Sequence, residues 1–241
     1  MSHLPIDAQP KPWGAPADLE VTARGEMAAR FMNQVYAWMA GGLALSGGVA
    51  TAVLSSDTLL EAAHRLYLPL IIAELVLVIG LSAMLNRLSA TLAATGFLFY
   101  AALTGVTFAP ILLRYTGASV ANVFLVTAGT FTGMAVFGAV TKKDLTSFGG
   151  FLIMGVWAIL LAGIVNMFLA NNALQFAISA LGALIFTGLT AYDVQQFKRM
   201  GYMGFSNPEQ RRKVALIGAL NLYLDFINIF LSLLRLFGSR R

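Results

Sequence analysis

Residues 214–237, VALIGALNLYLDFINIFLSLLRLF, form an apolar stretch long enough to cross a membrane, and an acidic residue, Asp225, stands at its middle. An ionised carboxylate at the centre of a bilayer is costly, so such a residue faces the protein interior or a water path. Small and polar residues recur in this stretch at steps of three and four: Gly218, Asn221, Asp225, Asn228, Ser232 and Arg235. At about 100° per residue they fall within an arc of about 100°. The sequence therefore predicts an apolar helix with one polar stripe that faces protein rather than lipid.

The composition is that of a polytopic membrane protein. Of 241 residues, 58% are hydrophobic and 11% are charged, with a mean hydropathy of +0.76, whereas soluble domains carry roughly 25% charged residues. The absence of cysteine excludes disulfides, thiolate metal sites and a cysteine nucleophile. The only histidines, His3 in a polar tail and His64 in a short loop, argue against a zinc site. The net charge of +5 reflects loop charges that orient helices, so nucleic-acid binding is not expected.

The chain divides into a tail and seven apolar stretches. Residues 1–26 contain four prolines and no apolar run that resembles a cleaved signal, which predicts a flexible cytoplasmic tail. Residues 27–238 are predicted to form a transmembrane domain, because each apolar stretch is near the roughly 20 residues that cross a bilayer. The stretches are 31–54, 68–86, 92–113, 119–140, 148–170, 173–193 and 214–237, and all connectors are short except 194–213.

The distribution of basic residues predicts the orientation. Eleven lysines and arginines lie on the side of the N-terminal tail and five lie on the other side, so the N-terminus is expected in the cytoplasm. Three of the five, Arg235, Arg240 and Arg241, follow the last stretch on the outer side. A re-entrant last segment would return them to the cytoplasm, and this alternative stays open. The compact chain suggests a bacterial inner membrane.

Two aspartates are the main candidates for function. If the last helix enters near Val214, Asp225 lies about 16 Å deep, while Asp193 lies about 7 to 8 Å inside the cytoplasmic boundary. The two residues stand on consecutive helices and could approach each other. Two carboxylates in an apolar site share one proton, and when fully ionised they repel each other or bind a cation such as calcium. The alternative is that each aspartate separately caps a kink or bonds to a neighbouring helix.

Three further charges need partners. Glu74 lies about 9 Å below the outer end of its helix, and we expect an ion pair between Glu74 and Arg235 at that side. Arg87 lies at the cytoplasmic end of the same helix as Glu74. Arg87 could latch Asp193, although such an arginine more often only anchors the helix at the interface.

Several runs resemble the Bax inhibitor family, also called transmembrane Bax inhibitor motif proteins. The main ones are LIFTGLTAYDVQQFK, residues 184–198, and LNLYLDFINIFLSLLRLFG, residues 220–238. Supporting runs are LSAMLNRLSA, FLFYAALTGVTFAPILLRYTGAS and KKDLTSFGG. The likeness covers about residues 27–238 in order. It implies an all-α fold of seven transmembrane helices with the C-terminal helix at the centre, wrapped by the other six.

The resemblance also implies a function. Members similar to this chain are pH-sensitive calcium leak channels, and their two sensor aspartates match Asp193 and Asp225, which are the candidate residues for calcium contact. A glutamate and an arginine of the family match Glu74 and Arg235. The chain departs from the pattern at Met84, where the family often has a basic latch residue, because the nearest basic residue here is Arg87.

The sequence therefore predicts a calcium or cation leak channel, gated by protonation of Asp193 and Asp225. The ion pathway would follow the stripe of Asn221, Asn228 and Ser232. Calcium is then the transported ion, with protons and the lipid bilayer as partners and no permanently bound cofactor.

Other readings stay open. One is a regulator of stress or cell death that acts through other membrane proteins. A proton-coupled transporter also fits two buried acids, but paired repeats with broken helices are not evident. An intramembrane aspartyl protease would use the Tyr192-Asp193 pair, but residues 222–224 lack the glycines of its second motif. We therefore expect no enzyme activity.

Overall fold

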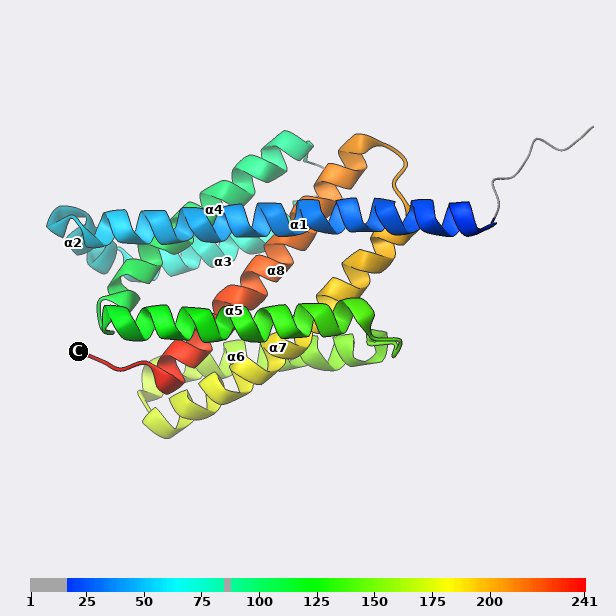
Figure 1. The fold of residues 1–241 in the computed structure, drawn as a ribbon. Coiled ribbons are helices and arrows are strands. Elements are labelled where there is room, and N and C mark those ends of the chain that lie inside the picture. Colours follow the sequence, from blue (N-terminus) through cyan, green and yellow to red (C-terminus); the bar gives the residue numbers. More distant parts are fainter. Residues whose placement is uncertain (1–16, 85–87) are drawn as a thin grey trace, which may run out of the picture.

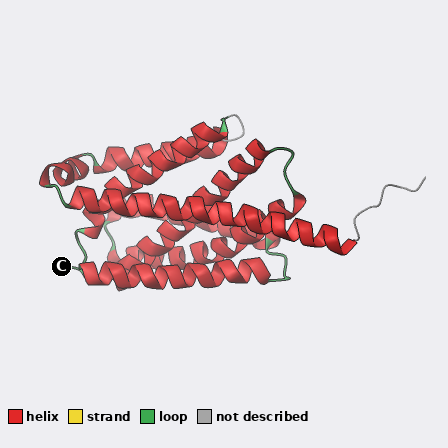
Figure 2. Cartoon of the chain, turned by 45° about the horizontal axis from the view of Figure 1, so that its top comes forward, coloured by secondary structure: helices red, strands yellow, loops and turns green. Residues whose placement is uncertain are grey.

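The computed structural model describes residues 17–84 and 88–241, and this part of the chain is a bundle of α-helices (Figure 1). In chain order they are α1 (Ala17–Leu54), α2 (Asp57–Arg65), α3 (Tyr67–Met84), α4 (Ala90–Leu112), α5 (Gly117–Val140), α6 (Thr146–Leu169), α7 (Asn172–Met203) and α8 (Pro208–Phe237). Seven of these helices are long and apolar enough to cross a membrane, which confirms the predicted fold class. The helices are joined by short loops (Figure 2).

The additional helix is α2, which occupies the connector between the first two spans. Ser56 caps its start by accepting a hydrogen bond from the Leu59 amide, Asp57 stands in its first turn, and Arg65 stands in its last. These positions suit the helix dipole. The sequence placed His64 in a short loop, and this prediction is wrong, because His64 lies in α2.

Three helices extend beyond the predicted apolar stretches at the end of the bundle that carries the start of α1. Helix α1 begins at Ala17, within the range 1–26 that was predicted as a tail. Helices α7 and α8 together take up most of the predicted connector 194–213, which leaves only residues 204–207 as a link. Gly204 has a φ of 80°, and Asn207 caps α8 ahead of Pro208 in its first turn. Hydropathy cannot mark such ends, because a helix that leaves the membrane continues in polar residues.

Helix α8 is the core of the bundle and runs obliquely through its middle (Figure 1). Within its most apolar window 67% of the residues are buried, compared with 6% for α3 and for α6. Helix α8 packs against α1, α4, α5 and α7, while α3 packs mainly on α4 and α6 on α7. The central position of the C-terminal helix is thus confirmed, with four helices around it and α3 and α6 on the outside.

The C-terminal residues fix the far end of α8. The Thr116 amide donates to the Ser239 carbonyl at 3.0 Å, and the Arg241 amide donates to the Arg114 carbonyl at 3.0 Å. Tyr115 and Arg240 form an antiparallel bridge. The chain end is therefore attached to the α4–α5 turn, at the opposite end of the bundle from residues 204–207 (Figure 1). Helix α8 crosses the whole bundle, so the re-entrant alternative is wrong.

Candidate functional site

The polar stripe of α8 faces α7 in one antiparallel register. In the second half of α8, a Cβ built on Gly182 would lie 2.8 Å from the Ser232 hydroxyl oxygen. In its first half, the Asn221 side chain lies within hydrogen-bonding reach of the Asp193 carboxyl. Both contacts fit the same alignment of the two helices. The α7–α8 interface therefore carries polar groups along most of the length of the core.

The structure places both aspartates at this interface. Asp193 is 9% exposed and Asp225 is 3% exposed, and the two carboxyls are near enough to interact electrostatically. Oδ2 of Asp225 is buried and has no hydrogen-bond partner among the described residues. Thr190 is also buried, but its hydroxyl donates to the Phe186 carbonyl of its own helix at 2.9 Å. A buried oxygen without a partner is costly, so this site calls for a proton, a cation or water.

Close contact between α5 and α7 holds Asp193 in place. A Cβ on Gly138 of α5 would collide with the backbone of Ala191, two residues before Asp193. Two residues after it, Gln195 accepts a hydrogen bond from the Leu145 amide at 2.9 Å and donates to the Lys143 carbonyl at 2.8 Å. The helix turns on both sides of Asp193 are therefore attached to α5 and to the α5–α6 connector.

The same connector carries an ion pair outside the spans. Asp144 Oδ1 accepts from the Thr146 amide at 2.9 Å and pairs with Arg199 Nη2 at 3.0 Å. The hydrogen bonds from Thr146, followed by that from Arg199, lower the pKa of Asp144 to about 2. Asp144 is therefore an ionised carboxylate near the start of α6 and at neutral pH does not titrate.

The remaining stripe residues differ in their surroundings. Ser232 is buried, while Asn221 and Asn228 are half-buried. The Asn228 amide donates to the Leu224 carbonyl of its own helix at 2.8 Å. The stripe is therefore a line of polar groups at the edge of the buried core and is not enclosed on every side.

The structure does not show the predicted ion pair between Glu74 and Arg235. Glu74 Oε1 lies 2.7 Å from the Thr107 hydroxyl oxygen, and none of the four ion pairs in the described part of the chain includes Glu74. Arg235 is exposed and lies with Arg114 near Tyr67, at the start of α3. Tyr67 precedes Glu74 by seven residues, about 10 Å of helix, so Arg235 stands too far toward the start of α3. Arg87, the proposed latch, lies outside the described residues.

A second buried polar cluster lies on the opposite face of α8. The Tyr223 and Ser46 hydroxyls are 2.7 Å apart, and Ser46 donates to the Ala101 carbonyl at 2.7 Å. The rings of Phe97 and Tyr100 pack edge-on to Tyr223. The sequence did not identify this cluster. The one feature of the sequence that could have predicted the cluster is Tyr223, a polar side chain in the last span that lies off the stripe.

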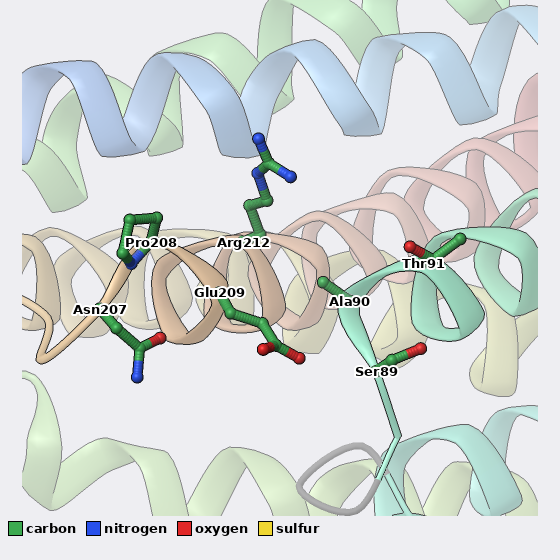
Figure 3. A pocket seen from close by; sticks show the side chains of 7 residues that line it. All are labelled: Ser89, Ala90, Thr91, Asn207, Pro208, Glu209 and Arg212. Carbon is green, nitrogen blue, oxygen red and sulfur yellow. The ribbon is translucent and has the colours of Figure 1, made fainter.

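A hollow of about 510 Å³ opens between the starts of α4 and α8 (Figure 3). Its lining includes Ser89, Glu209 and Arg212. Asp225 lies 13 residues after Arg212, about 20 Å along α8. This surface hollow is therefore separate from the aspartates.

Comparison with known proteins agrees with this architecture. Residues 28–241 match the sequence model of the family described as "Inhibitor of apoptosis-promoting Bax1". The chain is 47% identical over 215 residues to "Inner membrane protein YbhL" of Escherichia coli K12, covering 88% of this chain and 92% of that protein. It is 43% identical over 215 residues to a protein of Borreliella burgdorferi, covering 88% and 93%. With seven apolar helices, of which the C-terminal one is the most buried, this integral membrane protein belongs to the Bax inhibitor family.

Proposed function

We propose that the protein is a pH-sensitive leak channel for calcium or a similar cation, with its N-terminus in the cytoplasm. The observation that carries the proposal is that Asp193 and Asp225 are both buried at the α7–α8 interface and interact electrostatically, with one carboxylate oxygen of Asp225 left without a partner among the described residues. Two carboxylates that interact in an apolar interior form a proton-sharing unit. A unit of this kind on the core helix is suited to control how α7 and α8 pack.

The pair has the ligand chemistry for a passing cation. Calcium prefers carboxylate and amide oxygens, and Asn221 adds an amide next to the two aspartates. A resident calcium ion takes six to eight oxygens, and the described residues contain no group of three or more His, Cys, Asp or Glu that could hold a metal. We therefore treat the ion as cargo that contacts the aspartates in transit.

The packing suggests a direction for the pH response. In the structure both carboxyls are buried and the helices are in contact, an arrangement that one shared proton stabilises. Loss of that proton places two negative charges together in an apolar site and favours separation of α7 from α8. The leak should therefore increase as the cytoplasmic pH rises.

Calcium entry into proteoliposomes tests this proposal. With an indicator inside the vesicles, wild-type flux should rise by up to about tenfold per pH unit for a gate that releases one proton. Asp225→Asn and Asp193→Asn keep the side-chain volume and should each abolish the pH dependence. Asp144→Asn is the matched control at an exposed aspartate and should keep the wild-type profile. If Asp225→Asn retains both the flux and its pH dependence, the proposal is wrong.

A further inference from the structure

The contact between Glu74 and Thr107 contains a conflict of hydrogen-bond donors. The Thr107 hydroxyl lies 2.7 Å from Glu74 Oε1 and 3.0 Å from the carbonyl oxygen of Thr104. Both of these oxygens are placed as acceptors. A hydroxyl has one proton and can donate it to one acceptor at a time. With Glu74 ionised, one of the two short contacts therefore has no hydrogen in it.

A proton on Glu74 resolves the conflict. The protonated carboxyl then donates to the Thr107 oxygen, and Thr107 donates its own proton to the Thr104 carbonyl. Every short contact in the group contains one hydrogen, and no net charge remains. The alternative, an ionised Glu74, would place a half-buried charge in a lipid-facing helix of which only 6% is buried.

Among the described residues, the titratable side chains that interact with Glu74 are all tyrosines and none is a cation. They are Tyr67 of its own helix, Tyr100 of α4 and Tyr223 of α8. Two arginines, Arg114 and Arg235, lie near Tyr67 at the start of α3.

Helix α2 also packs against α3 but offers Glu74 no cation. Its arginine, Arg65, is paired with Glu61 of the same helix at 2.6 Å.

We propose that Glu74 is a proton-binding site, separate from the two aspartates, in which the carboxyl O–H donates to Thr107. Release of this proton turns the Thr107 hydroxyl from the Thr104 carbonyl to Glu74. Thr104 lies within hydrogen-bonding reach of Tyr223, so the change occurs next to the face of α8 that is opposite the aspartates. This site does not require that the protein conducts ions.

Infrared spectroscopy of the full chain in lipid nanodiscs tests the proposal directly. Labelling glutamate carboxyls with ¹³C separates their C=O stretch from that of the aspartates. At neutral pH the wild type should show a labelled, protonated-carboxyl band that Glu74→Gln removes and Asp225→Asn leaves unchanged. Thr107→Val should shift this band because the carboxyl loses its partner, and Thr107→Ser, which keeps the hydroxyl, should not.

The opposite result would overturn the proposal. If wild type and Glu74→Gln give the same labelled spectrum at neutral pH, Glu74 holds no proton there. Glu74→Asp guards against a folding defect of the glutamine variant, since it keeps a carboxyl at the site and should still remove the labelled band. A band that persists in Glu74→Asp would belong to another glutamate and would also reject the assignment.

Discussion

The two faces of α8 solve the problem of buried polar groups in opposite ways. Toward α1 and α4, Tyr223 and Ser46 form short hydrogen bonds that end on a backbone carbonyl. Toward α7, Asp225 has a buried oxygen without a partner, and its neighbour is a second carboxyl. On the first face each of these hydroxyls has a partner within the protein, whereas the Asp225 oxygen on the second face depends on what it binds. If the protein gates as proposed, α8 stays attached on the Tyr223 face and moves on the aspartate face.

The largest effect is expected from locking the aspartate face. A Cβ on Gly182 would lie 3.8 Å from the Ser232 Cβ, which matches the Cβ separation in disulfides, and the chain has no other cysteine. Oxidised Gly182→Cys/Ser232→Cys should reduce calcium flux to that of protein-free vesicles, and reduction should restore it. Each single cysteine variant serves as a control. Full flux through the cross-linked protein would show that α7 and α8 need not separate.

The second prediction compares two close glycine contacts, one on the Tyr223 face and one next to Asp193. Gly105 approaches the Ser46 backbone on the Tyr223 face, and Gly138 approaches Ala191 next to Asp193. Substitution of either glycine by alanine should destabilise the protein by about 1–3 kcal/mol through overpacking, measured by thermal unfolding in detergent. Gly133→Ala is the control, because a Cβ there meets nothing within 4 Å and should gain about 0.5–1 kcal/mol of helix stability. Equal stability of all three variants would contradict the close contacts.

The third prediction is that removal of the Tyr223 hydroxyl and removal of the Asp225 charge change the stability of the protein differently with pH. Tyr223→Phe removes the hydroxyl that contacts Ser46 and should destabilise the protein by about 1 kcal/mol at every pH. Asp225→Asn should instead be stabilising at high pH, because it removes a buried charge. Melting temperatures of both variants across pH provide the measurement. A pH-dependent loss for Tyr223→Phe that persists in a Glu74→Gln background would mean that the two faces are coupled.

The smallest effect is expected at Asp144, outside the spans. Its pKa is lowered from 3.8 to about 2 in the folded protein, so the stabilisation is present above about pH 4 and is lost as the pH falls toward 2. Asp144→Asn should therefore lower the melting temperature slightly at neutral pH and not at the acid end. A change in its flux profile near neutral pH would indicate that the α5–α6 connector takes part in gating.

Sequence patterns predicted the parts of the molecule that depend on contact with lipid. The apolar runs located all seven spans. The stripe through Asp225 predicted that the last helix faces protein, and the family resemblance predicted its central position. The pattern did not show how far α7 continues past Asp193, because polar residues outside the membrane follow no hydropathy rule. Charge and estimated depth also paired Glu74 with Arg235. The partner that the structure shows, Thr107, is a neutral residue on α4, and only the packing of α3 on α4 brings it near.

The place of the core helix after the other six spans has a consequence for biosynthesis. Because α8 is translated after these spans, they leave the ribosome before the helix around which they pack. Contacts among the earlier spans, such as those of α1 with α4 and of α5 with α7, must hold them until α8 inserts. The attachment of residues 239–241 to the α4–α5 turn can form only after that step.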